Sequence, residues 1–341
     1  MSIPIGEPIP PHMDRLVHFA TCDPGIHWQK DLRIAIDVDT KDRSANFLAP
    51  NVISLPGNGY RMYYTVLHWG RKGYLDSRAD IRSARSTDGV HWTIEPGTRI
   101  KPHDPYGALR VLCADVVPRP KGGYRMYFEA KTSDRPTVIL SAISTDGLDW
   151  QPEPGVRLSS DHKGLGAPRC LYFAATAHEQ TQISWHYRLY YHRRPHPDHY
   201  GTDAGHAICS ARSVDGLNFK EDPGPRLVQE HQHESYSIYA PEVLRLDNGG
   251  YRMYYAAWSE HPLRGRIFTA YSDDGLNWRK HPKPCLVFGG PWDAAKVSEP
   301  CVIDLPDGRY RMFYEASDNQ GQWRILSATS LPDRSSQTSL V

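Results

Sequence analysis

Carboxylates, a guanidinium and an amide flank the middle residue in five matching short segments of the chain. The segments read Ala49-Pro50-Asn51, Cys113-Ala114-Asp115, Ala167-Pro168-Arg169, Ala240-Pro241-Glu242 and Glu299-Pro300-Cys301. Carboxyl groups that converge on a bound molecule can serve as general acid and general base. We therefore predict Asp115, Glu242 and Glu299 as catalytic residues, with Asn51 and Arg169 binding the substrate.

A second set of polar and aromatic residues follows these segments and is predicted to form the outer wall of the same site. Its members are His68, Trp69, Glu129, His192, Trp258 and Glu315. The two indole rings could stack on sugar faces or simply pack loops, and the two glutamates could instead pair with arginines. All six are predicted as substrate-binding residues, with these structural alternatives left open.

The motif recurs because the whole chain repeats one unit. A tyrosine-led core occurs at Tyr60, Tyr124, Tyr187, Tyr251 and Tyr310, at spacings of 64, 63, 64 and 59 residues. Four of the cores are followed by a Ser-x-Asp-Gly-x-x-aromatic signature, which ends at Trp92, Trp150, Phe219 and Trp278. Two landmarks at a regular period indicate a repeat architecture.

Each repeat is predicted to hold four antiparallel strands, because two-residue alternation and Gly or Asp-Gly turns follow one another in every copy. The innermost strands are expected over 52–55, 116–118, 170–173, 243–246 and 302–305. Five such units predict an all-β, five-bladed β-propeller. Long connections, such as 67–80, should gather at the end of the ring where the innermost strands begin, and binding residues usually lie on such loops.

The last repeat lacks the Asp-Gly signature, and the N-terminus supplies a similar segment, Thr21 to Trp28, with Val17 to Ala20 before it. We predict that this segment completes the fifth blade and so removes an exposed sheet edge. One domain is expected over residues 1–341, with about 16–330 in the blades and 331–341 as a flexible tail.

Composition argues against several classes of partner. The net charge is +1, from 40 basic and 39 acidic residues, so we expect neither nucleic acid nor a membrane as partner. No signal peptide is visible at the N-terminus, so a cytoplasmic location is expected. The 6 cysteines have no C-x-x-C pair and are expected to be reduced thiols.

Histidines raise the question of a metal ion. The chain has 17, among them His231, His233, His196 and His199 in predicted loops. A His-x-His pair near an acid can bind a metal, but no complete ligand set can be named. No cofactor and no metal site are therefore expected, with a channel metal as the alternative.

The repeat pattern resembles the five-bladed propeller glycoside hydrolases, the arabinanase, levansucrase and invertase group with families 43, 32, 68 and 130. The resemblance covers about residues 16–330 and rests on the proline before a hydrophobic strand, the Gly turn, Tyr-x-x-Tyr-Tyr and Ser-x-Asp-Gly-x-x-Trp. It implies cleavage of a glycosidic bond by a general acid, a base and a helper carboxylate. The chain departs from family 43 at Ala49-Pro50-Asn51, where that family has Asp-Pro.

The function predicted from these features is a glycoside hydrolase-like enzyme that acts on a small carbohydrate or glycoside in the central pocket. Glu242 would be the general acid, Asp115 the base and Glu299 the residue that tunes the pKa of Glu242. The expected partner is a small-molecule or oligosaccharide ligand. Two alternatives remain: a non-hydrolytic lyase or cyclase on a small metabolite, and a carbohydrate-binding propeller without catalysis.

Overall fold

The chain is all-β in the part that the structure describes. The computed structural model describes residues 25–37, 44–57, 59–160, 164–173, 186–194, 206–247 and 249–331. Within these ranges the one helical element is the 3-10 turn η2 (Gln232–Glu234). No helix in the described ranges is long and apolar enough to cross a membrane. The predicted all-β class is confirmed.

The strands pair antiparallel in consecutive groups, each starting with a strand that carries one of the five motif segments. The first group is β2 (Ala45–Ser54), β3 (Tyr60–Gly70), β4 (Gly73–Ser86) and β5 (Thr93–Ile94). The second is β6 (Arg110–Pro118), β7 (Tyr124–Lys131), β8 (Val138–Ser144) and β9 (Gln151–Pro152). The third is β10 (Leu165–Tyr172), β11 (Tyr187–Arg193), β12 (Ala207–Ser213), β13 (Lys220–Glu221) and β14 (Leu227–Val228).

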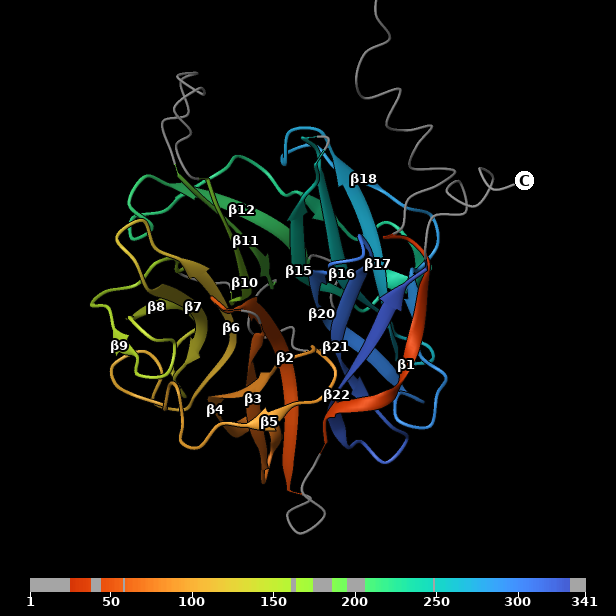
Figure 1. Cartoon of the computed structure of the whole chain (residues 1–341), viewed down its shortest axis with the longest axis horizontal. Helices are drawn as coiled ribbons and strands as arrows, with labels where there is room; N and C mark the ends of the chain where they lie inside the picture. The colour runs from red at the N-terminus through yellow and green to blue at the C-terminus, as the bar shows by residue number, and fades with distance from the viewer. Residues whose placement is uncertain are drawn as a thin grey trace, which may run out of the picture.

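The fourth and fifth groups follow the same plan. The fourth is β15 (Ser237–Arg245), β16 (Tyr251–Ser259), β17 (Arg264–Ser272), β18 (Arg279–Lys280) and β19 (Leu286–Val287). The fifth is β20 (Lys296–Asp304), β21 (Tyr310–Ser317) and β22 (Trp323–Ser330), and the N-terminal strand β1 (Trp28–Ile36) pairs antiparallel with β22. The groups are arranged around a common centre, with β2, β6, β10, β15 and β20 nearest to it (Figure 1).

The predicted strand limits need two corrections. The strands nearest the centre begin five to seven residues before the predicted starts; β2, for example, runs from Ala45 and not from Val52. The segment 67–80, predicted as a long connection, is instead a hairpin in which β3 and β4 continue to Gly70 and from Gly73. A proline and a β-bulge interrupt the two-residue alternation before Val52, and polar residues interrupt it in 67–80, so the predicted strands were too short.

The repeated tyrosine core holds neighbouring groups together. Arg61 Nη1 donates to the carbonyl of Asp146 at 2.8 Å, and Tyr63 Oη donates to the carbonyl of Gly147 at 2.8 Å. The turn that they contact is stiff, because Asp146 accepts the backbone N–H groups of two following residues and Gly147 has a φ of 76°. The Trp150 ring then packs edge-on against Tyr63, with 5.8 Å between centroids.

The same core–turn contact recurs in the other groups. Tyr127 Oη donates to Gly216 O at 2.9 Å, Tyr190 Oη to Gly275 O at 2.8 Å, and Arg311 Nη1 to Gly89 O at 3.2 Å. The repeated Arg, Tyr, Asp-Gly and Trp positions are therefore parts of one contact between successive groups. This contact explains why the two sequence landmarks recur together.

The N-terminus takes part in this contact through Gly25. Tyr254 Oη donates to the Gly25 carbonyl at 2.8 Å, and the Trp28 ring lies edge-on against Tyr254 at 5.7 Å. Gly25 and Trp28 thus occupy the places that an Asp-Gly turn and its Trp occupy elsewhere. The remaining predicted N-terminal residues, 17–24, and the tail from 332 lie outside the described residues.

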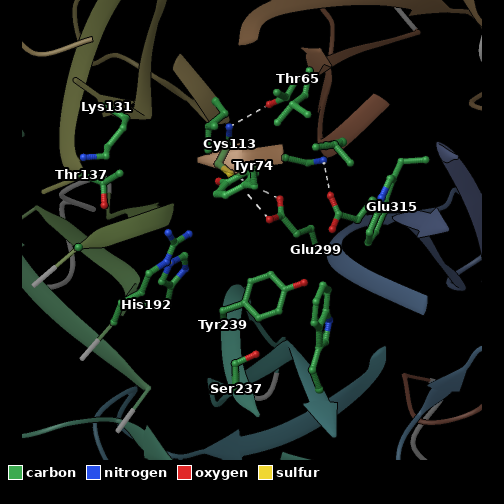
Figure 2. Close-up of a pocket in the computed structure, with 18 of the residues that line it drawn as sticks. Thr65, Tyr74, Cys113, Lys131, Thr137, His192, Ser237, Tyr239, Glu299 and Glu315 are labelled. Atoms are coloured by element: carbon green, nitrogen blue, oxygen red, sulfur yellow. Dashed lines mark hydrogen bonds between the residues drawn. The ribbon is translucent and has the colours of Figure 1, made fainter. Parts of the chain in front are cut away.

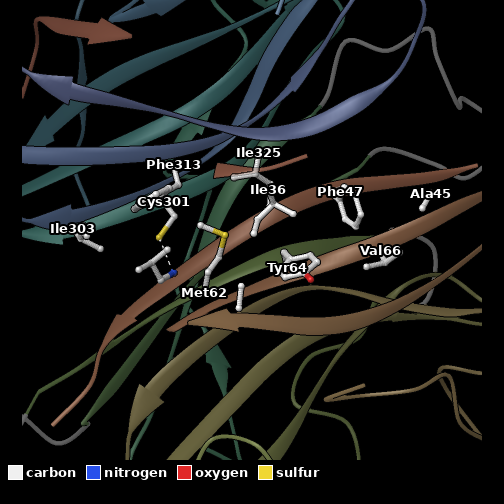
Figure 3. Close-up of a cluster of buried hydrophobic side chains, with 12 residues drawn as sticks. Ile36, Ala45, Phe47, Met62, Tyr64, Val66, Cys301, Ile303, Phe313 and Ile325 are labelled. Carbon is white, nitrogen blue, oxygen red and sulfur yellow. Dashed lines mark hydrogen bonds between the residues drawn. The ribbon is translucent and has the colours of Figure 1, made fainter. Parts of the chain in front are cut away.

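The hydrophobic core lies between neighbouring groups. One cluster joins Phe47, Met62 and Tyr64 of the first group to Phe313 and Ile325 of the fifth (Figure 3). Ile36 of the N-terminal strand packs into the same cluster. The first and fifth groups are therefore packed face to face, as are the other neighbouring pairs.

Candidate functional site

A pocket of about 900 Å³ opens near the centre of the strand groups. Residues of the β3–β4 hairpin, of the β7–β8 connection and of the ends of β16 and β20–β22 line it. These are the ends where most of the long connections were expected. Figure 2 shows Glu299 and Glu315 on one side of the pocket, with Lys131, Thr137 and His192 on another.

A β-bulge in each innermost strand shapes the floor of the pocket. The pairing register shifts at this point in all five innermost strands, for example between Leu48 and Asn51 of β2. The bulged residues are Ala49, Cys113, Ala167, Ala240 and Glu299, with φ values of 50°, 54°, 44°, 50° and 46°. Such positive φ values are costly for residues other than glycine and tend to occur at functional sites. Only Glu299 carries a long side chain there.

Four of the predicted polar residues lie one level below the bulges and form, with a cysteine, a set of five that we call the polar ring. Its members are Asn51, Asp115, Arg169, Glu242 and, by register, Cys301. The prediction placed Glu299 in this ring, and that placement is wrong because the bulge lifts Glu299 to a separate level. None of the five ring residues lines the pocket.

The ring residues bind one another and the neighbouring backbone. Asn51 Nδ2 donates to Asp115 Oδ1 at 3.0 Å, and Asp115 Oδ2 accepts the Cys170 N–H at 2.6 Å. Arg169 Nε donates to Glu242 Oε2 at 2.7 Å, and Glu242 Oε1 accepts the Val302 N–H at 2.9 Å.

These contacts cross from each innermost strand to the next. The Val52 N–H completes the circuit by donating to Cys301 Sγ at 3.2 Å. Every carboxylate oxygen of the polar ring thus has a partner in the protein, and these contacts fasten the innermost strands together. Burial raises the pKa of Asp115 to about 7 despite the nearby Arg169, and burial likewise raises the pKa of Glu242.

Glu299 and Glu315 are the carboxyl groups on the pocket floor. Glu315 Oε1 accepts a hydrogen bond from Ser298 Oγ at 2.6 Å, and its Oε2 accepts the Ala49 N–H at 3.2 Å. Glu299 is partly exposed, and its Oε2 lies 3.6 Å from the Cys113 thiol. Burial, and then the nearby charge of Glu315, raises the pKa of Glu299, and burial raises the pKa of Glu315 to about 7.

Glu129 on β7 and His192 on β11 lie at the strand positions equivalent to that of Glu315 on β21. Glu129 is 1% exposed and accepts the Ala167 N–H at 3.4 Å, while His192 is 2% exposed and lines the pocket. The neighbouring Gly166 is required here, since a Cβ atom at this position would lie 2.1 Å from Glu129 Oε2. Glu129 therefore supports the pocket wall from behind and His192 forms part of its surface.

Aromatic rings make up another side of the pocket. Trp258 stacks on Tyr236 with 6.0 Å between centroids and on Trp323 with 6.4 Å. The Lys296 ammonium lies 4.1 Å from the centre of the Trp258 ring. Sequence reasoning identified Trp258 and missed the other three, because Lys296 and Trp323 belong to the next group and Tyr236 lies 22 residues before Trp258, so only the fold brings them together.

The β3–β4 hairpin contributes Trp69, which is 46% exposed and packs edge-on against Tyr74. Both line the pocket. His68 does not line it, and its Nδ1 lies 3.4 Å from Ser44 Oγ. Of the predicted substrate-binding residues, Trp69, His192, Trp258 and Glu315 thus meet at the pocket, whereas Asn51, Arg169, His68 and Glu129 lie outside its lining.

The described residues contain no group of three or more His, Cys, Asp or Glu side chains that could hold a metal ion. His231 precedes the turn η2 and His233 lies within it; the buried Glu234 of this turn accepts backbone N–H groups and pairs with Lys280 at 2.8 Å. His196 and His199 lie outside the described residues.

The chain is similar to several carbohydrate-active proteins. A beta-1,2-mannobiose phosphorylase from Thermoanaerobacter sp. (strain X514) is 33% identical over 109 residues, which cover 32% of this chain and 33% of that enzyme. A solved structure described as a glycoside hydrolase matches with a TM-score of 0.76 at 17% identity, over 95% of this chain and 96% of that chain. An endo-arabinase from Bacteroides thetaiotaomicron VPI-5482 matches with a TM-score of 0.61 at 16% identity, over 88% and 97%. No family model matches the chain.

Proposed function

The chain has the fold of the propeller glycoside hydrolases, as its motifs predicted, and we propose that it is a closed five-bladed propeller that hydrolyses a glycosidic bond. The substrate would be a small carbohydrate or glycoside bound in the central pocket. The observation that carries this proposal is the pair of carboxyl groups, Glu299 and Glu315, on the floor of a pocket whose walls also carry aromatic rings and cationic side chains. Paired carboxyl groups are the groups with which most glycosidases cleave their substrates.

Glu299 is the proposed proton donor to the leaving oxygen. Its raised pKa keeps it protonated near neutral pH, and its partial exposure gives it access to a ligand. Glu315 is held by Ser298 and the Ala49 N–H, in an orientation suited to its ionised form. Its negative charge raises the pKa of Glu299 and would stabilise the positive charge that develops on the sugar ring.

Asp115 and Glu242 are reassigned in this proposal from catalysis to support. Their carboxylate oxygens already bind Asn51, Arg169 and two backbone N–H groups, and neither residue lines the pocket. A general base needs a free oxygen within reach of the water that it activates. The ring that they form would hold the floor on which Glu299 stands.

The test is turnover of a panel of aryl glycosides and unsubstituted oligosaccharides by the wild-type chain and by Glu299→Gln. The substitution should lower kcat by about 10²-fold or more, as removal of a general acid does. The loss should shrink on aryl glycosides with good leaving groups, which need no proton. Asp115→Asn with a comparable loss of kcat, but unchanged stability, would instead favour the original assignment.

Product analysis separates hydrolysis from related reactions. Free sugar released without added phosphate indicates hydrolysis, whereas a sugar phosphate formed only with phosphate indicates phosphorolysis, the activity named for the Thermoanaerobacter relative. An unsaturated or cyclic product would favour the lyase or cyclase alternative. Tight binding of sugars with no turnover of any substrate would favour a carbohydrate-binding propeller.

A further inference from the structure

Hydrogen-bond donors gather on the side of the pocket away from Glu299 and Glu315. We call Lys131, Thr137, His192 and Arg194 the donor lobe; all four line the pocket. Backbone contacts hold the lobe together, since the Arg194 N–H donates to Gly164 O at 2.9 Å and the Leu165 N–H to Thr137 O at 3.2 Å. Lys131, Thr137 and His192 lie together on one side of the pocket in Figure 2.

The imidazole of His192 presents a donor without a protein partner. Arg194 Nε donates to His192 Nε2 at 3.1 Å, so the ring proton of neutral His192 must lie on Nδ1. Burial and the Arg194 charge lower the pKa of His192, which keeps the ring neutral. His192 Nδ1 is buried and has no hydrogen-bond partner among the described residues. An unsatisfied buried donor destabilises the folded protein, and a ligand acceptor would remove that cost.

The charges around the lobe are positive on balance. Lys131, Arg194 and Arg135 stand against Glu129 and Asp134, with Arg194 3.9 Å from Glu129 and Arg135 3.8 Å from Asp134. Arg110 also acts electrostatically on Lys131, so the cations outnumber the acids among the described residues around the lobe. Burial, followed by the like charge of Arg110, lowers the pKa of Lys131, as expected for a cation whose charge is incompletely compensated.

We propose that the donor lobe binds a carboxylate of the substrate, so that the enzyme acts on a glycoside that contains a uronic acid. This inference rests on the proposed function and names the substrate class of the same pocket. A carboxylate offers acceptors to the His192 N–H, the Thr137 hydroxyl and the Lys131 ammonium at once. Its negative charge would also compensate the positive charge of the lobe, which a neutral sugar hydroxyl could not do.

Binding of free sugars tests the inference separately from catalysis. Isothermal titration of the Glu299→Gln protein with glucuronate and galacturonate, against glucose and galactose, measures the preference for a carboxylate. At least one uronate should bind 10-fold or more tightly than its neutral parent, and added NaCl should weaken that binding. Equal binding of the uronates and the neutral sugars, or no binding of either uronate, would overturn the inference and leave the proposed cleavage standing.

Substitutions in the lobe locate the contact. Lys131→Met should abolish the uronate preference and leave the binding of the neutral sugar unchanged. His192→Asn places an amide donor near Nδ1 and should keep most of the preference, whereas His192→Gln places it near Nε2 and should lose it. If inorganic phosphate binds to the wild-type protein and neither uronate does, the lobe is a phosphate site and the uronate proposal is refuted.

Discussion

Replacement of Trp28 tests how strongly the N-terminal strand holds the fold together. The Trp28 ring packs edge-on against Tyr254 of the fourth group, and its Nε1 donates to the Gly25 carbonyl at 3.0 Å. An internal copy of this arrangement exists at Trp150, which packs against Tyr63 and donates to Gly147 O at 3.1 Å. Trp28→Ala and Trp150→Ala therefore remove the same contacts at two boundaries between strand groups.

The size of the effect follows from the burial of the two rings. Truncation of a fully buried Trp to Ala costs about 3–5 kcal/mol. Trp28 and Trp150 are both half-buried, and the carbonyl that each leaves keeps a tyrosine hydroxyl as its donor. The lost burial is therefore roughly half the maximum, and the edge-on pair adds about 0.5–1.5 kcal/mol. We expect each variant to lose about 2–3 kcal/mol of unfolding free energy on these grounds.

Urea unfolding followed by tryptophan fluorescence and by circular dichroism measures the loss. Trp69→Ala is the control, because Trp69 is 46% exposed at the pocket and should cost less than about 1 kcal/mol. The closed-ring reasoning requires Trp28→Ala and Trp150→Ala to agree within about 1 kcal/mol, a range set by the usual context dependence of such costs. A Trp28→Ala protein as stable as the wild type, beside a destabilised Trp150→Ala protein, would refute the contribution of the N-terminus to ring closure.

Three further predictions concern the polar ring, the pocket floor and the fifth strand group. Asp115→Asn should lower the unfolding free energy by about 1–3 kcal/mol, because an amide cannot accept both N–H groups that Asp115 binds, and thermal melting measures the loss. Asp115 and Glu315 have pKa values of about 7 in the folded chain, above the ordinary 3.8 and 4.5, so folding takes up protons between about pH 4 and 7. Urea midpoints should therefore fall as pH rises through that window, and Glu315→Gln should flatten the slope; a midpoint that rises from pH 5 to 7 in both proteins would contradict this sign. Phe313→Tyr should raise the melting temperature, because Phe313 stands where Tyr63, Tyr127 and Tyr190 donate to a glycine carbonyl; an unchanged or lower melting point would show that Gly89 O cannot accept the added hydroxyl.

The repeat and the strand pairing could be predicted because they depend on local chemistry. Asp-Gly turns need a glycine at positive φ, and the alternating Tyr-Arg-Met-Tyr pattern needs two different faces. The role of Arg61 and Tyr63 could not be derived in this way, because their acceptors, Asp146 and Gly147, lie more than 80 residues away. The stacking of Trp323 on the predicted Trp258 was missed for the same reason, because the two rings belong to different strand groups.

Whether a carboxylate lies at the pocket or in the buried polar ring could not be predicted, because this depends on a β-bulge. No glycine marks the bulged positions in the sequence. Ala49, Cys113, Ala167 and Ala240 adopt the same left-handed conformation as Glu299, and a simple two-residue alternation assumes that no such bulge exists. Once the bulge is present, Glu299 and Cys301 separate, with Glu299 at the pocket and Cys301 in the buried ring. The sequence still contains the distinguishing signal, because four of the five bulged positions hold a small residue and the fifth holds a glutamate. The bulges shape the floor in all five repeats, so the strained conformation is structural, and the long acidic side chain at Glu299 alone is the feature that calls for a catalytic explanation.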